Sequence, residues 1–227
     1  MDGTTRGSPS PRRSRPGPAS DPVTTGLVIG PDGLARCGWG AGADGSAGAS
    51  LYRAYHDEEW GRPVTDDRGL FERLSLEGFQ SGLAWITILR KRDGFRTAFA
   101  HFDWTTVARY DDRDVERLLA DAGIVRHRGK IEATIGNARA MPEVIARHGS
   151  LADLVWAHSP AHRPAPRRLA DLVATSTEST ALAKALQACG FRFIGPTTAY
   201  AAMQAVGVVN DHLVGCHARA SCEAARP

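Results

Sequence analysis

The 227-residue sequence contains no run of about 18 consecutive apolar residues, so it offers no candidate for a membrane-spanning helix. The arginine-containing N-terminus has no apolar block behind it, which argues against a secretory signal. A mitochondrial transit peptide stays open as an alternative, because this segment is rich in serine and arginine and poor in acidic residues. We therefore expect no membrane partner.

Cysteine is scarce as well, and neither sign of charge dominates. The four cysteines, at positions 37, 189, 216 and 222, are too few for a disulfide framework in a chain this long. We expect a reduced, cytoplasmic protein with some thiols free to bind metal. The net charge of +3 favours anionic partners but is too small to diagnose nucleic-acid binding.

Sustained alternation of apolar and polar residues is also absent, which excludes a large sheet and predicts an all-α protein. Apolar residues instead recur at helical spacing. Six segments are predicted as helices on this basis: residues 67–79, 83–100, 111–123, 126–140, 176–190 and 197–205. Gly94 is expected to weaken the second of these, and Pro142 to begin a further helix.

Composition separates a core from its flanks. Residues 1–35 and 221–227 carry too few large apolar side chains to offset the entropy of ordering, so both are predicted to be disordered tails. The core, residues 36–220, contains a Gly/Ala-rich stretch at residues 40–50 that is predicted to be a flexible insertion.

A helix-hairpin-helix is predicted over residues 189–200, where one helix ends at a glycine and another begins after a short apolar link. The glycine permits a tight turn, and free N–H groups at Gly195, Thr197 and Thr198 are candidates for holding a DNA phosphate. An ordinary turn between two helices would show the same pattern, so DNA binding is one of two interpretations.

Two cysteines and two histidines together form a candidate metal site. His212 and Cys216 are spaced i, i+4 and would share one face of a helix, while Cys37 and His56 lie at the front of the core. Such a set makes a closed, structural zinc site that staples the two ends of the chain. The alternative is that both cysteines are small buried apolar residues and that His56 is a capping or surface residue.

An acidic residue is predicted to point inward from the helix over residues 67–79. Leu70, Leu74 and Glu77 follow one another at i, i+4 and i+7, so Glu77 falls on the apolar face. A carboxylate there is costly unless it meets hydrogen-bond donors, which a ligand with N–H groups would supply. A buried arginine, or the end of a neighbouring helix, is the alternative partner.

Aromatic residues gather around the same region of the sequence. Tyr52 and Tyr55 are one helical turn apart, and together with Trp39, Trp60 and Trp85 they would form a stacking slot for a flat ring. Packing in the core is the alternative, above all for Trp60. The basic run at residues 126–130 would contact phosphates or else form a solvated face.

These motifs, taken in order, resemble the 3-methyladenine DNA glycosylase I family of the helix-hairpin-helix superfamily. The resemblance extends from Arg36 to Cys216, interrupted by the insertion after Trp39. It is carried by the strings RCGW, YRAYHDEEWG, LEGFQSGLAWITIL, AGIVRHRGKIEATIGNARA, GFRFIGPTTAYAAMQAVGVVNDH and HLVGC. The resemblance implies a helix-hairpin-helix glycosylase fold, a structural zinc, and alkylated double-stranded DNA as the partner of a monomeric enzyme.

The resemblance also implies roles for individual residues. The family's zinc ligands match Cys37, His56, His212 and Cys216. Its base-recognising glutamate, expected to carry catalysis, matches Glu77, and its stacking aromatics match Tyr55 and Trp85 with Tyr52 beside them. Asn210 stands where related glycosylases carry a catalytic aspartate, and Asp211 is one residue away. The spacing from Cys37 to His56 is longer than is usual in the family, because the insertion lies between them.

The expected reaction is excision of 3-methyladenine by base flipping and hydrolysis of its glycosidic bond. No lysine is placed to form a Schiff base, so a monofunctional enzyme without strand cleavage is expected. Two other functions explain parts of the pattern. A non-catalytic DNA-binding module would account for the hairpin and the basic run, and a metal-dependent hydrolase would use the Cys/His set with one open position.

Overall fold

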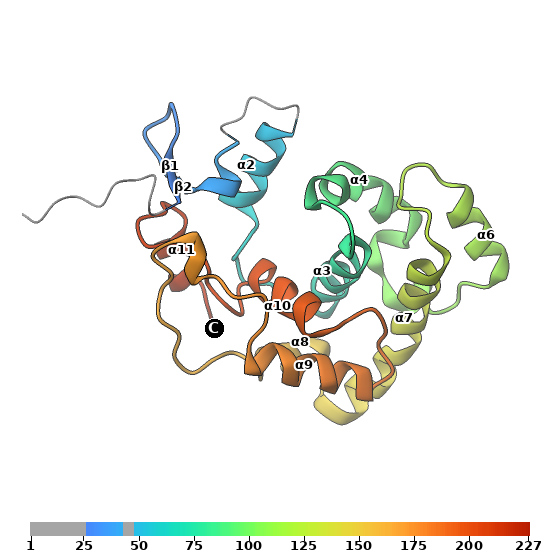
Figure 1. Cartoon of the computed structure of the whole chain (residues 1–227). Helices are drawn as coiled ribbons and strands as arrows, with labels where there is room; N and C mark the ends of the chain where they lie inside the picture. Colours follow the sequence, from blue (N-terminus) through green and yellow to red (C-terminus); the bar gives the residue numbers. More distant parts are fainter. Residues whose placement is uncertain (1–25, 43–47) are drawn as a thin grey trace, which may run out of the picture.

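The computed structural model describes residues 26–42 and 48–227 of the chain, and most of these residues are helical (Figure 1). The α-helices are α2 (Ala49–Glu58), α3 (Asp67–Gln80), α4 (Trp85–Ala98), α5 (Trp104–Val107), α6 (Asp112–Ala120), α7 (Arg128–His148), α8 (Leu151–Trp156), α9 (Thr177–Ala188), α10 (Pro196–Ala205) and α11 (Arg219–Ala224). Three short 3-10 helices, η1 (Gly38–Gly40), η2 (Ala100–Phe102) and η3 (Leu169–Asp171), join them. Within the described ranges, no helix has the length and apolarity needed to cross a membrane.

Helices α3, α4, α7, α9 and α10 enclose the main hydrophobic core. Helix α3 contributes a run of buried residues that includes Phe71 and Phe79, and it packs against both α4 and α10. Asp66 caps its N-terminus by accepting a hydrogen bond from the Gly69 N–H at 2.8 Å. Because α3 is buried along most of its length, a polar side chain on its inner face meets the interior of the protein.

Two predicted helix boundaries differ from the structure. Helix α4 runs through Gly94 without a break, and this glycine is needed because a Cβ there would stand 2.5 Å from the Gly123 carbonyl oxygen. Helix α7 runs through Pro142 to His148 as one element, so Pro142 does not begin a new helix. Pro142 is exposed, whereas Met141 and Val144 beside it are buried, and this packing holds the helix together across the proline.

A small antiparallel sheet, absent from the all-α prediction, lies at one end of the molecule. Strands β1 (Leu27–Ile29) and β2 (Ala35–Cys37) pair with Leu27 opposite Cys37. Part of the predicted disordered tail, residues 27–35, is therefore structured, because the hairpin gains backbone hydrogen bonds and packs Leu27 on a buried cluster. Residues 1–25 of that tail lie outside the described residues.

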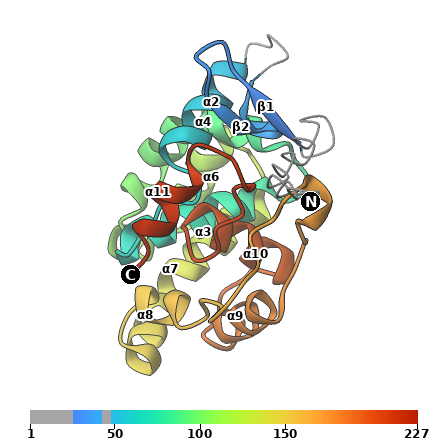
Figure 2. The ribbon, with the colours of Figure 1, turned by 90° about the vertical axis from the view of Figure 1, so that its left-hand side faces the viewer.

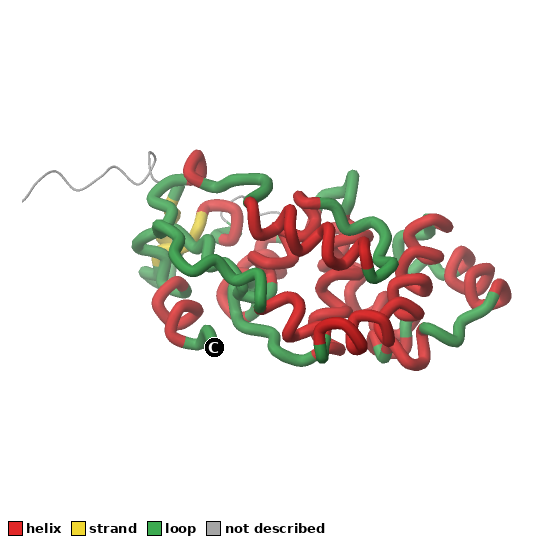
Figure 3. The backbone as a smooth tube through the Cα atoms, turned by 90° about the horizontal axis from the view of Figure 1, so that it is seen from below, coloured by secondary structure: helices red, strands yellow, loops and turns green. Residues whose placement is uncertain are grey.

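The two ends of the described chain meet. Figure 1 shows β1, β2 and α2 beside the C-terminal segment, with α6 at the opposite end of the molecule, and Figure 2 shows the same neighbours from the side. Seen from below in Figure 3, loops and short strands gather at this end, while helices fill the rest. Helix α11 buries Cys222 completely, so the prediction of disorder over residues 221–227 is wrong for this residue.

The predicted insertion over residues 40–50 is only partly described. Gly40 ends η1, Ala41 is buried, and Ala49 begins α2 with its side chain packed inside. Residues 43–47 lie outside the described ranges. The segment between α8 and α9 contains Pro160, Pro164 and Pro166, and it is a connection that passes through η3.

Candidate active site

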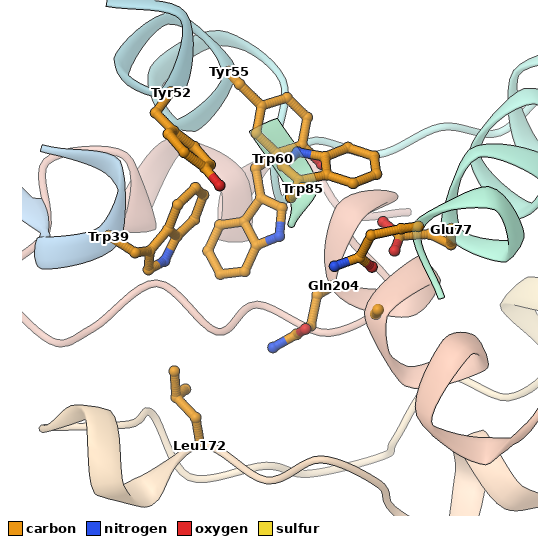
Figure 4. A pocket seen from close by; sticks show the side chains of 10 residues that line it. Trp39, Tyr52, Tyr55, Trp60, Glu77, Trp85, Leu172 and Gln204 are labelled. Carbon is orange, nitrogen blue, oxygen red and sulfur yellow. The ribbon is translucent and has the colours of Figure 1, made fainter. Parts of the chain in front are cut away.

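A cavity of about 440 Å³ opens between α2, α3, α4 and α10. Aromatic rings form one side of it and polar side chains the other, as Figure 4 shows. Its lining residues are Trp39, Tyr52, Tyr55, Trp60, Glu77, Gln80, Trp85, Leu172, Ala201 and Gln204. All the predicted base-contacting residues are therefore brought together here, and the cavity is large enough for a planar ring of purine size.

Glu77 provides the acidic group of the cavity from the buried face of α3, as its spacing from Leu70 and Leu74 predicts. Its side chain makes no hydrogen bond or ion pair with any described residue, although it is only 5% exposed. Burial raises the pKa of Glu77 to about 8, and the charge of Arg73 opposes that rise. The carboxyl group is thus held without a protein partner at the wall of an accessible cavity.

The alternative partner for Glu77, an internal arginine, is excluded for the described residues. Arg73 lies one helical turn before Glu77 on α3, but its guanidinium donates to Glu59 Oε2 at 2.8 Å. Arg92 binds the same carboxylate at 2.6 Å. Glu59 therefore takes up both nearby arginines, and Glu77 stays available to a ligand.

The rings of Tyr55 and Trp85 contact each other in the wall of the cavity. The ring centroids of Tyr55 and Trp85 are 5.4 Å apart at 46°. Tyr55 is buried, and this burial raises the pKa of its hydroxyl group well above the usual range. Trp85 Nε1 is buried without a hydrogen-bond partner in the described part of the chain. A flat ligand with an acceptor would satisfy this donor.

Three further rings complete the aromatic wall. Trp39 and Trp60 meet edge to face at 4.8 Å, and Trp39 lies 6.2 Å from Tyr52. The Tyr52 hydroxyl accepts the Ile86 N–H at 3.2 Å, which ties α2 to the start of α4. Trp60 was expected in the core; it is buried there and also lines the cavity.

A groove leads from Glu77 to the start of α10. Its volume is about 480 Å³, and it is lined by Glu77, Gln80, Ser81, Gly82, Leu83, Thr197, Thr198 and Ala201. Gly195 is the N-cap of α10 and supplies no side-chain cap, and Pro196 is the first helical residue. Thr197 is exposed. The first turn of α10 is therefore an accessible helix N-terminus on the same groove as the acid.

A short link joins α9 to α10 at the position where the sequence predicts the hairpin. Gly190 follows the end of α9 with φ +102°, and Phe193 also has a positive φ of +59°. Asn137 on α7 fixes the link at two points, because its Oδ1 accepts the Arg192 N–H at 2.7 Å and its Nδ2 donates to the Arg192 carbonyl at 3.1 Å. Asn137 was not among the residues predicted from the sequence; the available signal was a polar residue on the apolar face of a helix.

The basic run at residues 126–130 does not form a continuous phosphate-binding face. Lys130 is buried, and its Nζ donates to the carbonyl oxygens of Phe79 at 2.8 Å and Ser81 at 2.6 Å. It thereby ties α7 to the end of α3, beside the groove. Arg128 forms an ion pair with Glu116. Within the described structure, only Arg126 and His127 of the run are exposed and have no carboxylate partner.

The four predicted metal ligands come together, all buried, with their donor atoms within 4.8 Å of one another. Cys216 Sγ lies 3.5 Å from both His56 Nε2 and His212 Nδ1, and Cys37 Sγ lies 3.8 Å from His212 Nδ1. Contact with Cys37, followed by hydrogen bonds from the imidazoles, lowers the pKa of Cys216. The set joins residues at both ends of the described chain.

His212 and Cys216 do not share a helix face, contrary to the prediction from their spacing. The segment between them is a turn in which Gly215 has φ +92° and Cys216 N–H donates to the Leu213 carbonyl at 2.9 Å. The turn brings the two side chains together because a residue with positive φ reverses the chain more sharply than a helix does. The glycine was a readable signal for this turn.

Each histidine of the set has a partner at the ring nitrogen that faces away from the cysteines. His56 Nδ1 contacts Asp57 Oδ1 at 2.8 Å, and His212 Nε2 contacts the Trp60 carbonyl at 3.0 Å. Arg36 in turn pairs with Asp57 at 2.8 Å. Such contacts select the ring nitrogen that faces a metal. Two thiols and two imidazoles with these supports fit a zinc ion, which all four residues would hold; the sequence indicated the four residues but not the supporting Asp57.

Asn210 and Asp211 both lie away from the cavity. Asn210 Nδ2 donates to Glu223 Oε2 at 2.8 Å and to the Arg219 carbonyl at 3.0 Å, which anchors α11. Asp211 is buried, accepts hydrogen bonds from Tyr200 and Gln204, and pairs with Arg163 at 3.0 Å. Glu77 is therefore the one carboxyl group among the described residues that line the cavity.

Comparisons with known proteins agree on one group. The sequence profile of the methyladenine glycosylase family matches residues 46–220. The chain is 48% identical to DNA-3-methyladenine glycosylase 1 of Escherichia coli (strain K12) over 186 residues, which cover 81% of this chain and 96% of the relative. It is 43% identical to DNA-3-methyladenine glycosylase of Haemophilus influenzae over 175 residues, covering 76% of this chain and 94% of that protein.

A solved structure with a bound base shows the same arrangement of the chain. It is a tyrosine-to-phenylalanine variant of a 3-methyladenine DNA glycosylase I in complex with 3-methyladenine, and it superposes with a TM-score of 0.73 at 30% identity. The match covers 80% of this chain and 97% of that one. Both the sequence and the helical architecture therefore point to the same family.

Proposed function

This chain belongs to the methyladenine glycosylase family, and from this membership we infer that it is a DNA-3-methyladenine glycosylase, a base-excision enzyme that releases 3-methyladenine from alkylated DNA. The observation that carries the assignment is the unpaired carboxyl group of Glu77 in an aromatic-walled cavity. The substrate we propose is double-stranded DNA. The enzyme is proposed to act as a monomer, since the cavity and its groove are lined by residues of one chain. A cytoplasmic location is proposed from the small number of cysteines alone.

The chemistry explains why this simple site suffices. Methylation at N3 gives the adenine a positive charge within the nucleotide, so the base departs as a neutral molecule and needs no general acid. The enzyme must then flip the nucleotide out of the helix and hold the base in place. Water bonds to the sugar carbon C1′ as the bond from C1′ to the base breaks, and the proton of that water passes to the solvent. No lysine lines the cavity within the described ranges, which supports hydrolysis without a Schiff base or strand cleavage.

Glu77 is proposed to select the damaged base. As a carboxylate it accepts hydrogen bonds from the adenine edge, and it attracts the cationic base more strongly than the neutral one. Tyr55 and Trp85 are already in contact at 5.4 Å, so they are proposed to pack together against one side of the base, with Tyr52 beside them. A cation over an aromatic face gains about 0.5–2 kcal/mol, which again favours the methylated base.

Base release from methylated duplex DNA tests the proposed function directly. The purified protein is incubated with alkylated DNA, and the free base is identified by mass spectrometry, with strand integrity checked on a denaturing gel. We expect 3-methyladenine and intact strands that break only after alkali. A non-catalytic DNA-binding module would retain the DNA and release no base.

The pH dependence of catalysis is expected to follow Glu77. Because burial raises the pKa of this carboxyl group to about 8, the free enzyme gains its negative charge only as the pH rises through that value. We expect kcat/KM for base release to increase with pH and level off above about 8, since kcat/KM reports groups of the free enzyme. A flat profile between about pH 6 and 9 would contradict this role of the carboxylate.

The start of α10 is proposed to bind a phosphate beside the flipped nucleotide, through the N–H groups of Gly195, Thr197 and Thr198. Its position on the groove that contains Glu77 supports this proposal. Thr197→Glu places a negative charge there, and we expect about tenfold weaker binding to duplex DNA, measured by fluorescence anisotropy. Binding of free 3-methyladenine should not change.

A matched control for this charge is Ala146→Glu, on the exposed side of α7. It adds the same charge to the protein far from the groove, so any loss common to both variants reports net charge alone. Equal weakening of DNA binding in the two variants would remove the phosphate site from the proposal.

The Cys/His set is proposed to bind a structural zinc ion through Cys37, His56, His212 and Cys216. Two thiolates and two imidazoles are ligands that zinc prefers, and four of them leave no open position for a substrate. The oriented histidines support the assignment. Zinc would supply no step of the reaction; it would join the β-hairpin and the C-terminal turn to α2, which carries Tyr52 and Tyr55 of the aromatic wall.

A further inference from the structure

A glutamate and two arginines form an ion-pair cluster whose charges act on Tyr55 of the aromatic wall. Glu59 follows the end of α2, Arg73 comes from α3 and Arg92 from α4. Arg73 donates to Glu59 Oε2 at 2.8 Å, while Arg92 donates to Oε1 at 2.8 Å and to Oε2 at 2.6 Å. All three side chains are largely buried, with exposed fractions of 25%, 13% and 16% in the order named. The cluster therefore joins α2, α3 and α4, three of the four helices around the cavity.

One hydrogen-bond donor of Arg73, the arginine one helical turn from Glu77, is left without a partner in the cluster. Arg73 Nη1 is buried and has no hydrogen-bond partner among the described residues. Arg73 and Glu77 are four residues apart on α3, a spacing at which arginine and glutamate side chains commonly pair. They do not pair here, although the charge of Arg73 acts on Glu77. Arg73 Nη1 and the Glu77 carboxyl group thus stay apart, although neither has another hydrogen-bond partner among the described residues.

We propose that Glu59 is a positioning residue for excision: by binding Arg73, it keeps this arginine off Glu77 and leaves the Glu77 carboxylate free for the damaged base. Arg92 also binds both oxygens of the Glu59 carboxylate, and this second ion pair keeps the Glu59 side chain in place. The inference rests on the proposed role of Glu77 in base recognition. Glu59 itself does not line the cavity.

The charges around Arg73 explain why the carboxylate at Glu59 is needed. A buried guanidinium is costly without a counter-ion, so loss of Glu59 would send it to another acid. Glu72 is engaged by Arg96 at 2.8 Å, which leaves Glu77 as the unpaired acid one turn away on α3. A base would then have to displace Arg73 before it reached the carboxylate.

The test compares E59Q, R73Q and the double variant E59Q/R73Q with the parent protein. Two quantities are measured: excision from methylated duplex DNA, and binding of free 3-methyladenine through the fluorescence of the tryptophans that line the cavity. We expect E59Q to lose about tenfold to a hundredfold in both quantities, because the new salt bridge opposes binding of the base. R73Q removes the competitor and should stay within about fivefold of the parent.

Rescue separates this proposal from a purely structural role. E59Q/R73Q is expected to recover to the level of R73Q, although it lacks more of the cluster than E59Q does. E72Q is the matched control: it breaks a comparable ion pair, with Arg96, on the same helix and should leave both quantities unchanged. Parental activity from E59Q, or a folded double variant that is as impaired as E59Q, would overturn the proposal.

Two further outcomes have a defined meaning. If E59Q does not fold, E59D replaces it, because aspartate keeps the charge on a shorter side chain. We then expect E59D to lose part of both quantities and E59D/R73Q to regain them. If R73Q does not reverse the loss, the proposal is overturned. If the parent protein itself releases no 3-methyladenine, the proposed function fails. That result is distinct from an active parent whose variants at position 59 are equally active.

Discussion

Replacing Glu77 with glutamine or alanine is expected to lower kcat/KM for release of 3-methyladenine by at least about a hundredfold, while the fold is retained. Glutamine keeps the size of the side chain but removes its negative charge and places donors where acceptors are needed. The carboxyl group binds no described residue, so its loss leaves no partner unsatisfied. Base release from methylated duplex DNA measures the effect.

The same substitution should stabilise the protein at high pH. Glu77 has a pKa of about 8 in the folded chain, above the ordinary value of 4.5. An acid with a raised pKa favours folding while it is protonated, and this contribution is lost as the pH rises from the lower value to the higher one. We therefore expect Glu77→Gln to raise Tm at about pH 9 and to leave it nearly unchanged at about pH 4. Excision would thus depend on an acid that destabilises the free enzyme.

Glu58→Gln provides the control for the loss of one carboxylate, because Glu58 is exposed on α2 and does not line the cavity. It should affect neither excision nor the pH dependence of Tm. If a folded Glu77→Gln protein released the base at the parental rate, another group would have to recognise it.

The second large effect is expected at the Cys/His set. Cys216→Ser should remove about one zinc ion per chain and lower Tm by about 10 °C, since a structural zinc contributes to folding through all of its ligands. The effect should be large because the set connects the β-hairpin, α2 and the turn before α11. Elemental analysis and thermal unfolding measure the two quantities.

Cys189→Ser is the matched control for this variant. Cys189 is also buried, but it lies at the C-cap of α9 outside the set. Its substitution should keep the metal content and report the cost of placing a hydroxyl group in the core. The zinc assignment would be contradicted if parent and Cys216→Ser contained the same amount of metal, or if neither contained any.

Excision should respond to the loss of zinc only through stability. The aromatic wall is carried partly by η1 and α2, which are adjacent to Cys37 and His56, and no set member lines the cavity. At a temperature where Cys216→Ser stays folded, we therefore expect excision within about tenfold of the parent. A metal-dependent hydrolase would instead lose activity together with its metal at any temperature.

Local sequence determined much of this protein. The spacing of Leu70, Leu74 and Glu77 placed the acid on the buried face of α3. Helices α3 and α9 begin within one residue of their predicted starts, where Asp66 and Ser176 cap them. The glycines of the hairpin likewise indicated the link between α9 and α10. These features depend on neighbours within about one or two helical turns, which is the range over which periodicity and capping act.

The partner of each buried charged side chain depends on the tertiary structure and could not be predicted from the local sequence. Arg73 pairs with Glu59 and not with Glu77, although the closer spacing along the chain favours Glu77. Lys130 is taken up by the end of α3, 49 to 51 residues away, and not by phosphates. Asp211 is enclosed by Arg163 and Tyr200 and does not line the cavity. A buried charge takes whichever partner the packing of distant helices brings within reach, and no local pattern encodes that choice.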